Sequence, residues 1–286
     1  MANVILTPDV IAREALMVLR NNAVMANLVH RDYSNDFVAG VGDTITIRKP
    51  ASFEAKEYNG DIVVQDATES GIPVVMDKHL DVSFKVTSKD LSMNIEDFSK
   101  QLLVPAMQAF ADKIDAYLLG LKADITNKVT GSADIKNDVI DARAYLTKSA
   151  APLTERRFVY GTNTESKLLK TDLFTSAEKV GDAGTALREA SLGRKFGLDF
   201  YVDQNADTAG VDGLAFHKNA FAFVTRPLAI PQGAAKAEIV NYDGFGLRVV
   251  QGYDLKTKSD TISIDMVCGV KTLNKDLAAI IEGAGA

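Results

Sequence analysis

The sequence predicts an α+β fold whose main sheet joins strands from distant parts of the chain. Three observations carry this prediction. Apolar and polar residues alternate near residues 44–48 and 80–87, which indicates strands. A long amphipathic helix is predicted over residues 94–125, and strand patterns return over residues 237–273. Because helical segments separate the early strands from the late ones, we expect them to meet in one sheet.

The bulk composition is that of an ordinary globular protein. The 286 residues are 47% hydrophobic and 24% charged, and the formal net charge of −6 argues against non-specific electrostatic binding to nucleic acid. The single cysteine, Cys268, excludes an intrachain disulfide, and its apolar strand context favours a buried small hydrophobe. We find no signal-peptide pattern and no apolar run near the roughly 18 residues that span a bilayer. We therefore expect a soluble protein that is intracellular at synthesis.

The N-terminal segment is predicted to begin with a helix. Thr7-Pro8-Asp9 combines a capping side chain, a proline in the first turn and an acid at the positive end of the helix dipole. Ile11, Ala15 and Val18 then line one face. Because this piece is short and polar residues follow it, we interpret residues 1–42 as an arm rather than a core element.

Two strand patterns enclose a polar excursion. Residues 44–48 alternate with period two, and residues 51–71 are polar and acidic. Within the excursion, Tyr58-Asn59-Gly60-Asp61 is a turn signal and residues 62–64 are a short strand candidate. From Leu80 to Thr87 the alternation is strict, which predicts a half-buried strand.

The next predicted element is an unusually long helix. Apolar residues recur at every third or fourth position between Asn94 and Ile125. Some 30 residues at about 1.5 Å each would give a rod of about 45 Å, whereas average helices have only about 11–12 residues. We expect Pro105 either to bend this helix or to mark a break after a first short helix.

From about residue 135 the pattern changes to short helices and strands in alternation. Helices are expected at residues 139–149 and 164–173, and strands or mixed pieces at 157–160, 198–202 and 214–224. The last third predicts strands at residues 238–240, 247–250 and 261–270, with a hairpin turn at Gly244-Phe245-Gly246.

The sequence offers few side chains arranged for chemistry. His30, His79 and His217 share no metal-ligand spacing. Residues 203–207 lack the glycine and the final glutamate of a calcium loop. The glycines form no phosphate-binding loop, and there is no nucleophile elbow. We therefore predict no catalytic, cofactor-binding or metal-binding residues, and interpret the chain as a structural protein.

Asp112 and Asp115 are the one carboxylate pair on the long helix that needs a separate interpretation. They lie three residues apart and are expected to share a face. Paired carboxylates do acid–base chemistry only in a desolvated cleft, and on a helix this polar we favour a solvated or subunit-facing edge. If the chain were instead an α+β enzyme with a scattered site, Asp112, Asp115 and His217 would be tested first.

Four stretches of this sequence carry a resemblance to a known family. They are residues 42–50 (GDTITIRKP), 216–228 (FHKNAFAFVTRPL), 247–254 (LRVVQGYD) and 268–273 (CGVKTL). Together with the order of the elements, they resemble the major capsid (coat) proteins of tailed double-stranded DNA bacteriophages, especially the short-tailed-phage coat type. The chain has no room for the large domain that the best-known member of that type inserts between its axial strands.

The resemblance implies a phage major-capsid fold with five parts. These are an N-terminal arm (residues 1–42), an extended β loop with flanking strands (43–93), a long spine helix in a peripheral domain (94–134), an axial domain (135–228), and returning peripheral strands with the C-terminal segment (229–286).

The resemblance also implies a shell subunit of the virion. The subunit would self-assemble into pentamers and hexamers of an icosahedral shell, with scaffolding and portal proteins as partners. The procapsid, built in the host bacterial cytoplasm, would expand as DNA enters, without sequence-specific DNA binding, a membrane or a cofactor. Lys56, Glu57 and Tyr58 are then candidate contacts with the neighbouring subunit, and Asp9 and Glu14 candidate contacts with a basic scaffold element.

Other assignments stay open beside this one. A nanocompartment shell of the same fold would hold enzyme cargo instead of DNA. A phage tail or neck component would form tubes or rings rather than shells. An α+β enzyme would show turnover that is lost by substitution without loss of assembly.

Overall fold

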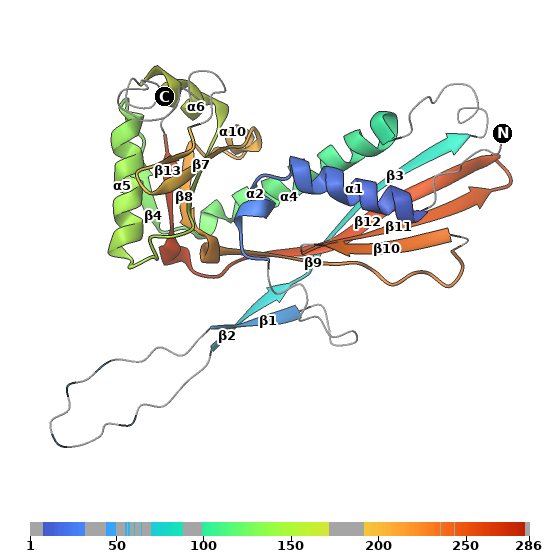
Figure 1. The fold of residues 1–286 in the computed structure, drawn as a ribbon, viewed down its shortest axis with the longest axis horizontal. Helices are drawn as coiled ribbons and strands as arrows, with labels where there is room; N and C mark the ends of the chain where they lie inside the picture. The colour runs from blue at the N-terminus through green and yellow to red at the C-terminus, as the bar shows by residue number, and fades with distance from the viewer. Residues whose placement is uncertain are drawn as a thin grey trace.

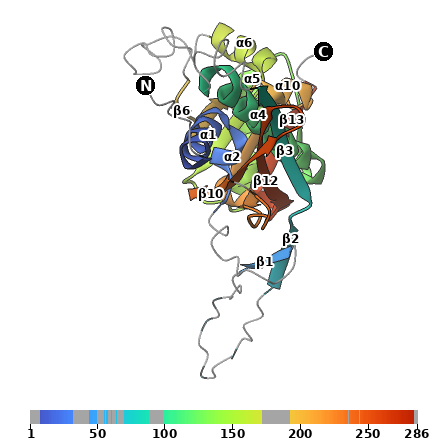
Figure 2. The same cartoon turned by 90° about the vertical axis from the view of Figure 1, so that its right-hand side faces the viewer.

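The computed structural model describes residues 8–31, 44–49, 70–87, 99–171, 192–234, 236–242 and 244–283, with the single residues 55, 57, 60 and 64. These residues form an elongated α+β body with two lobes, as the sequence predicts (Figure 1). One lobe holds a five-stranded sheet and the other a six-stranded sheet. A two-stranded ribbon projects from the body, and Figure 2 shows that it points away from both lobes.

The five-stranded lobe is built on antiparallel pairs between distant strands. Its strands follow the order β10-β11-β12-β3, and β9 also pairs with β12. Exposed and partly buried residues alternate along β3 up to Val86, which confirms the predicted half-buried strand. The strands are β3 (Lys78–Thr87), β9 (Phe221–Arg226), β10 (Lys236–Tyr242), β11 (Phe245–Asp254) and β12 (Ser259–Thr272).

The longest strand, β12, connects the early and late parts of the chain. It pairs with β3 from Ser259↔Thr87 to Cys268↔Lys78. On its other side it pairs with β11 up to Asp265 and then with β9 from Val267 onward. The expected sheet between strands that are far apart in sequence is therefore present.

The N-terminal helix α1 (Pro8–Asn22) is part of the core of this lobe. It packs against α4 (Val104–Gly120), β10 and β11. The interpretation of this segment as an arm outside the core is wrong for α1 and for the short helix α2 (Met25–Leu28), which also packs on α4. The apolar stripe of α1 is wider than its sequence pattern suggested, as expected of a helix that lies on a sheet. Its buried residues are Ile11, Ala12, Ala15, Leu16 and Leu19, each at most 6% exposed.

The predicted long helix is present in a shorter and less regular form. A π-helical turn covers Ser99–Leu103, α4 follows directly, and a 3-10 turn covers Leu121–Asp124. The first predicted residues of the helix, 94–98, lie outside the described part of the chain. Pro105 lies in the first turn of α4, where its missing N–H costs no intrahelical hydrogen bond. The chain thus changes its helical winding just before Pro105, rather than bending in the middle of one α-helix.

The six-stranded lobe has the strand order β4-β13-β8-β5-β7-β6. The β13–β4 and β5–β7 pairs are parallel, and the other pairs are antiparallel. Helix α5 (Ile135–Lys148) packs along β13, β4 and β8. The remaining elements are β4 (Asn127–Thr130), β5 (Arg156–Tyr160), α6 (Thr162–Lys170), β6 (Arg194–Lys195), β7 (Leu198–Val202), α10 (Asn205–Thr208), β8 (Gly213–His217) and β13 (Ala278–Glu282).

Three strands of this lobe, β4, β6 and β13, were not predicted. The last strand, β13, comes from the segment expected among the peripheral strands, yet it lies between β4 and β8. Ala278 to Ile281 are four buried residues in a row, so β13 shows no polar–apolar alternation. The other missed strands, β4 and β6, have only four and two residues. The segment 214–224, expected to hold strands or mixed pieces, contains two strands, because a 3-10 turn at Lys218–Ala220 separates β8 from β9.

The hairpin between β10 and β11 turns one residue earlier than predicted. Tyr242 pairs with Phe245, so Phe245 and Gly246 belong to the strand rather than to the turn, and Gly244 has φ +78°. Gly246 already belongs to β11, and a Cβ there would come within 2.6 Å of Pro227 Cδ. The close approach of Pro227, and not the turn, therefore explains why position 246 is a glycine.

The projecting ribbon consists of β1 (Thr44–Lys49) and β2 (Ser70–Val75). They pair antiparallel from Thr44↔Val75 at the body to Lys49↔Ser70 at the outer end. This pairing confirms the strand predicted at residues 44–48. Of the predicted strand at 62–64, only Val64 is described, and it lies in no strand.

Candidate assembly interface

The outer part of the ribbon was predicted to touch a neighbouring subunit. Of the three candidates, Glu57 is described and exposed, whereas Lys56 and Tyr58 lie outside the described residues. Val64, from the same excursion, is 85% exposed. These three candidates therefore remain predictions.

The base of the ribbon is attached to the body by a small apolar cluster. Ile47 of β1, with Val74 and Met76, packs against Ala222 and Val224 of β9. Each of these side chains is at most 8% exposed. The ribbon therefore leaves the body from a packed base, and its direction is set by the body.

A close backbone approach further fixes the ribbon. A Cβ on Gly269 of β12 would come within 2.5 Å of the Val75 carbonyl oxygen and 3.3 Å of Met76 Cα. Both neighbouring atoms belong to the backbone, so they cannot turn aside as a flexible side chain would. Only glycine lets the end of β2 lie this close to β12.

We expect Gly269→Ala to shift the ribbon base and to lower the free energy of unfolding by about 1–3 kcal/mol. The comparison is Gly252→Ala in β11 of the same sheet, where no atom lies within 4 Å of the added Cβ. The measurement is the urea midpoint of both variants against wild type. Equal midpoints for the two variants would show that the contact with Val75 is not tight.

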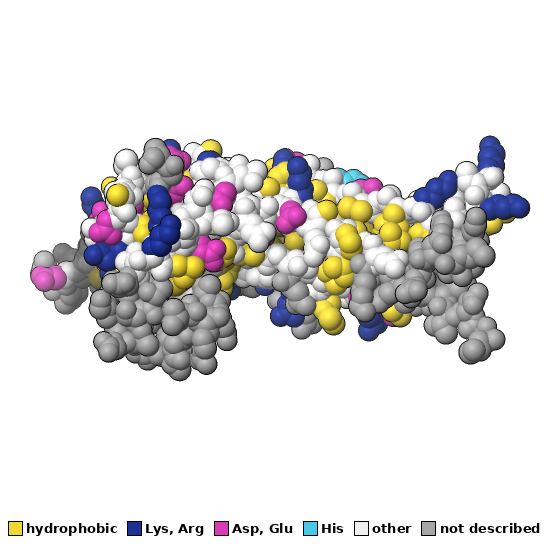
Figure 3. Space-filling model, turned by 90° about the horizontal axis from the view of Figure 1, so that it is seen from above, with side chains coloured by type: hydrophobic (Ala, Val, Ile, Leu, Met, Phe, Trp, Pro, Cys, Tyr) yellow, Lys and Arg dark blue, Asp and Glu magenta, His cyan; other side chains and the backbone are white. Residues whose placement is uncertain are grey.

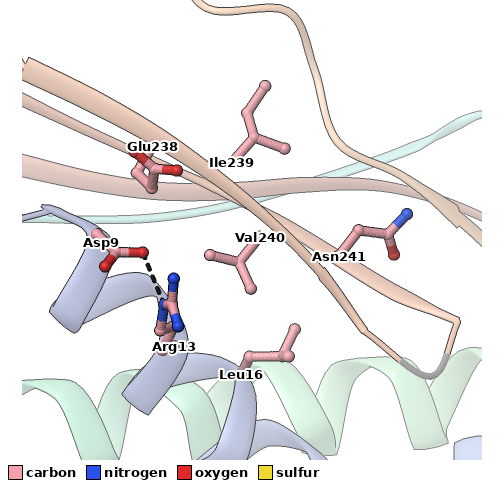
Figure 4. Close-up of a pocket in the computed structure, with 7 residues that line it drawn as sticks. All are labelled: Asp9, Arg13, Leu16, Glu238, Ile239, Val240 and Asn241. Carbon is pink, nitrogen blue, oxygen red and sulfur yellow. Dashed lines mark hydrogen bonds and ion pairs between the residues drawn. The ribbon is translucent and has the colours of Figure 1, made fainter.

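A shallow groove lies between α1 and the edge strand β10 (Figure 4). Its volume is about 390 Å³. Within it, Asp9 Oδ1 accepts a hydrogen bond from Arg13 Nε at 2.7 Å, and this bond raises the pKa of the guanidinium. The groove is lined by Asp9, Arg13, Leu16, Glu238, Ile239, Val240 and Asn241.

Asp9 and Glu14, the two acids predicted to contact a scaffold, both interact with groups of their own chain. Asp9 bonds within its own helix, and its side chain is 44% exposed against 74% for Arg13. Glu14 is partly buried and has an interaction of its own. A contact between either acid and a scaffold remains a prediction.

Several apolar side chains are exposed and were not among the predicted contact residues, most of which are charged. Val10 and Met17 lie seven residues apart on α1 and are 44% and 65% exposed. Tyr253 and Leu255, at the β11–β12 connection, are 51% and 81% exposed. Figure 3 shows hydrophobic side chains gathered on one face of the molecule among charged ones. The seven-residue spacing on a helix was the signal that could have found the first pair.

The Asp112–Asp115 pair is divided by the fold. Asp112 is exposed and accepts a long hydrogen bond, 3.4 Å, from Asn205 Nδ2. Asp115 is only 1% exposed, so the expectation of a solvated or subunit-facing edge is wrong for this residue. Its two oxygens accept the backbone N–H groups of Val24 at 2.8 Å and Ala26 at 3.2 Å. The N-terminal segment covers this face of α4, which the sequence pattern of α4 cannot reveal.

The three histidines do not form a common site, and each one contacts different residues. His217 is 3% exposed, its Nδ1 accepts the Asn219 N–H at 3.2 Å, and burial lowers its pKa. His79 Nε2 lies 3.5 Å from Asp265 Oδ2, and His30 forms a backbone bridge with Ala222. In the described ranges, no three His, Cys, Asp or Glu side chains come together in a group that could hold a metal ion.

Cys268 is fully buried in β12, as predicted for a small hydrophobe. Burial raises the pKa of its thiol to about 12, which keeps it in the unreactive protonated form. None of the helices in the described part of the chain is long and apolar enough to cross a membrane.

Comparisons with solved structures place this architecture among capsids. A structure from Mycobacterium phage Che8 matches with a TM-score of 0.66 and 22% identity, over 92% of each chain. The capsid structure of the cyanophage P-SCSP1u matches with a TM-score of 0.56 and 15% identity, over 86% of this chain and 85% of the other. The chain has the phage capsid fold.

The same fold extends to a particle that is not described as a phage capsid. A virus-like particle from Pyrococcus furiosus matches with a TM-score of 0.56 and 13% identity, over 95% of this chain and 98% of the other. No protein-family profile matches the sequence, and no curated protein matches it. The similarity is therefore one of fold, carried by the arrangement of the elements.

Proposed function

We propose that this chain is a major capsid protein, the repeating subunit of an icosahedral shell that encloses a double-stranded DNA genome. One observation carries the proposal: the capsid fold covers nearly the whole chain, and nearly the whole of each matched chain. No large part is left over for a separate catalytic domain. The proposed role is structural.

Physical features of the subunit support a role in assembly. A closed shell needs contacts between different surfaces of identical subunits. The ribbon β1–β2 projects from the body and so extends the reach of the subunit (Figure 1). The edge strands β3 and β10 and the exposed residues Met17 and Leu255 offer further surfaces. Many weak contacts of this kind would add up around a shell.

The finer assignment follows the resemblance of the sequence. The six-stranded lobe would be the axial domain at the centre of pentamers and hexamers, and the ribbon would lie on the neighbouring subunit. Scaffolding and portal proteins would guide assembly of a procapsid in the host bacterial cytoplasm, and the shell would expand as DNA enters. The net charge of −6 would lower the affinity of the subunit for the packaged DNA.

The first test is whether the purified chain, alone or with a scaffold, forms closed particles. Negative-stain electron microscopy and sedimentation velocity are expected to show shells of uniform size. Nuclease-protected double-stranded DNA in particles from infected cells would support the genome-enclosing role. A strictly monomeric protein at high concentration, even with scaffold, would overturn the proposal.

A nanocompartment shell is the second candidate, and the match to the virus-like particle from Pyrococcus furiosus favours it. Such particles would contain protein cargo and no protected genome, so the contents separate the two candidates. Tubes or rings would instead indicate a tail or neck component. Turnover that is lost on substitution of Asp112 or His217, without loss of assembly, would indicate an enzyme.

A further inference from the structure

Two carboxyl groups are buried where the two lobes meet. Asp115 lies on α4 of the five-stranded lobe and is 1% exposed. Asp203 lies between β7 and α10 in the six-stranded lobe and is 2% exposed. Helix α10 packs on α4 and also on α6 and β5. Helices α4 and α10 therefore meet at the joint between the lobes (Figure 1), and the two acids lie on α4 and just before α10.

The two carboxyl groups are held differently. Asp115 accepts two backbone N–H groups, from Val24 and Ala26, and so attaches the N-terminal segment to α4. Asp203 accepts the Asn205 N–H through Oδ1 at 2.9 Å. Its Oδ2 is buried and has no hydrogen-bond partner in the described part of the chain. Burying an ionised oxygen in that position costs much more free energy than burying a protonated one.

The charged groups around the joint offer these acids no cation. Asp112 of α4 is the charged group that faces Asp203, and it repels a second negative charge. Helix α6 carries Glu165, Lys167 and Lys170, and in the described part of the chain none of them forms an ion pair with Asp115 or Asp203. Arg156 of β5 donates to the Ala151 and Pro152 carbonyls and to Thr147. Further charged groups on or beside the packed elements interact with other atoms. They are Asp207, which accepts the Thr162 N–H at 2.9 Å; Lys122, which donates to the Gly210 carbonyl at 2.9 Å; Arg157, which donates to the Leu28 carbonyl; and Lys113, whose Nζ lies 5.4 Å from the centre of the Tyr117 ring.

We propose that Asp115 and Asp203 form a proton-dependent latch between the lobes. While the pair holds a proton, α10 and the segment 23–28 stay seated on α4. Loss of the proton leaves two buried negative charges without a cation, which repel each other and favour hydration. The joint then opens more often, and the two lobes gain freedom relative to each other.

The direction of the pH dependence follows from burial. Burial raises the pKa of Asp115 to about 7, with the charge of Asp203 adding to the rise and the backbone hydrogen bonds opposing it. In an opened joint the pKa returns to about 3.9. Between these values the closed joint binds more protons than the open one. Its stability is therefore highest in acid, falls as the pH rises through about 4 to 7, and is lowest and constant above that range.

Hydrogen exchange of the backbone amides in residues 23–28 and 203–211 tests the latch on the folded chain. Exchange rates are divided by the intrinsic rate at each pH, which gives a protection factor. In wild type, this factor is expected to fall by up to about tenfold per pH unit up to about pH 7 and then to level off. A flat profile from about pH 5 to pH 8 would overturn the proposal.

Substituting each acid in turn distinguishes the contributions of Asp115 and Asp203 to the pH dependence. Asp115→Asn removes the main titrating group and is expected to give a flat profile. Asp203→Asn removes the like charge, so the fall is expected to move to lower pH. The matched control is Asp141→Asn, an exposed acid on α5, which should behave as wild type. A wild-type slope in Asp115→Asn would sink the latch.

A direct observation of the proton keeps the test decisive if Asp115→Asn does not fold. Infrared difference spectra of wild type are expected to show the C=O stretch of a protonated carboxyl group in acid, lost with a midpoint near pH 7. Absence of that band in the folded protein would overturn the proposal. Both measurements are made on the subunit itself, so the latch can fail while the shell-forming function stands, and the reverse.

Discussion

A chain in which Asn-Gly replaces residues 50–69 is expected to fold and to lose the ability to form closed shells. Lys49 pairs with Ser70, so the two inserted residues would close β1 and β2 as a tight hairpin. The buried residues of the ribbon base, Ile47 and Val74, stay in place. The folded body is therefore preserved, while the part of the ribbon predicted to meet a neighbour is removed.

The expected effect is large because it is repeated in every subunit. Even about 1 kcal/mol lost per contact is multiplied around a shell, so particles should disappear rather than become slightly less stable. Electron microscopy and sedimentation measure the particles, and circular dichroism with thermal melting measures the fold. Lys56, Glu57 and Tyr58 replaced together by alanine should raise the protein concentration needed for assembly.

The control keeps the length of the excursion and changes its sequence. In this variant a Gly-Ser linker of equal length replaces residues 50–69. If only the specific residues matter, both variants fail to assemble; if length alone matters, the linker variant still forms shells. Particles of normal size from the Asn-Gly variant would contradict the proposed role of the ribbon.

Arg156→Met is expected to be the most destabilising single substitution considered for the six-stranded lobe. Arg156 is 1% exposed, and its guanidinium donates to the Pro152 carbonyl at 2.8 Å, the Ala151 carbonyl at 2.7 Å and Thr147 Oγ1 at 3.0 Å. These acceptors lie at the C-terminal end of α5 and just beyond it, where carbonyl groups lack helical partners and a positive charge is favoured.

The balance of effects favours a net loss. Burial lowers the pKa of Arg156, and the charge of Arg143 adds to this, so the guanidinium is itself costly to bury. Removing it, however, leaves the buried Ala151 carbonyl and the partly buried Pro152 carbonyl without this donor. We expect the free energy of unfolding to fall by about 2–4 kcal/mol. Arg156→Lys should recover only part, because an ammonium cannot reproduce the planar fork of three donors.

Denaturant unfolding of the subunit measures this loss. The control is Arg194→Met in β6 of the same lobe, where the exposed side chain makes a long hydrogen bond, 3.5 Å, to the Leu153 carbonyl and a long ion pair, 3.8 Å, with Asp199. Its effect should stay within about 0.5 kcal/mol. A stability of Arg156→Met equal to that of Arg194→Met would show that the buried guanidinium does not hold the end of α5.

Local patterns predicted those elements whose two faces differ. In β3, one face is exposed and the other is partly buried, so the alternation is visible in the residues themselves. The same applies to α5, whose buried residues Val139, Ala142 and Leu146 recur with helical spacing. These elements were predicted because the sequence records which side of each one meets water.

One element that is buried on both faces, β13, was not predicted. In β13 the residues Ala278 to Ile281 are all buried, so no alternation marks the strand. The 3-10 turn after His217 separates two apolar segments, and the sequence pattern left open whether they form one strand or separate pieces. Here the interruption comes from the passage of the chain between two sheets, a tertiary event.

The fold prediction is confirmed, whereas the candidate contact residues stay predictions. The sequence pointed to charged residues on the ribbon and on α1, and Asp9 proved to be bonded to Arg13 within its own helix. The amphipathic pattern of α1 is the same whether its apolar face meets its own chain or another. Its assignment as an arm was therefore wrong, although its helical state was predicted correctly.

By itself, the sequence determined the α+β class, the positions of most strands and helices, and the absence of a recognisable catalytic motif. The tertiary structure alone decided that α1 lies in the core, that β13 crosses to the second sheet, and that Asp115 is buried beneath residues 24–26 while Asp112 stays exposed. The physical reason is the same in each case. Periodicity reports which face of an element is apolar, whereas only long-range packing decides what covers that face and which buried charge is left without a cation.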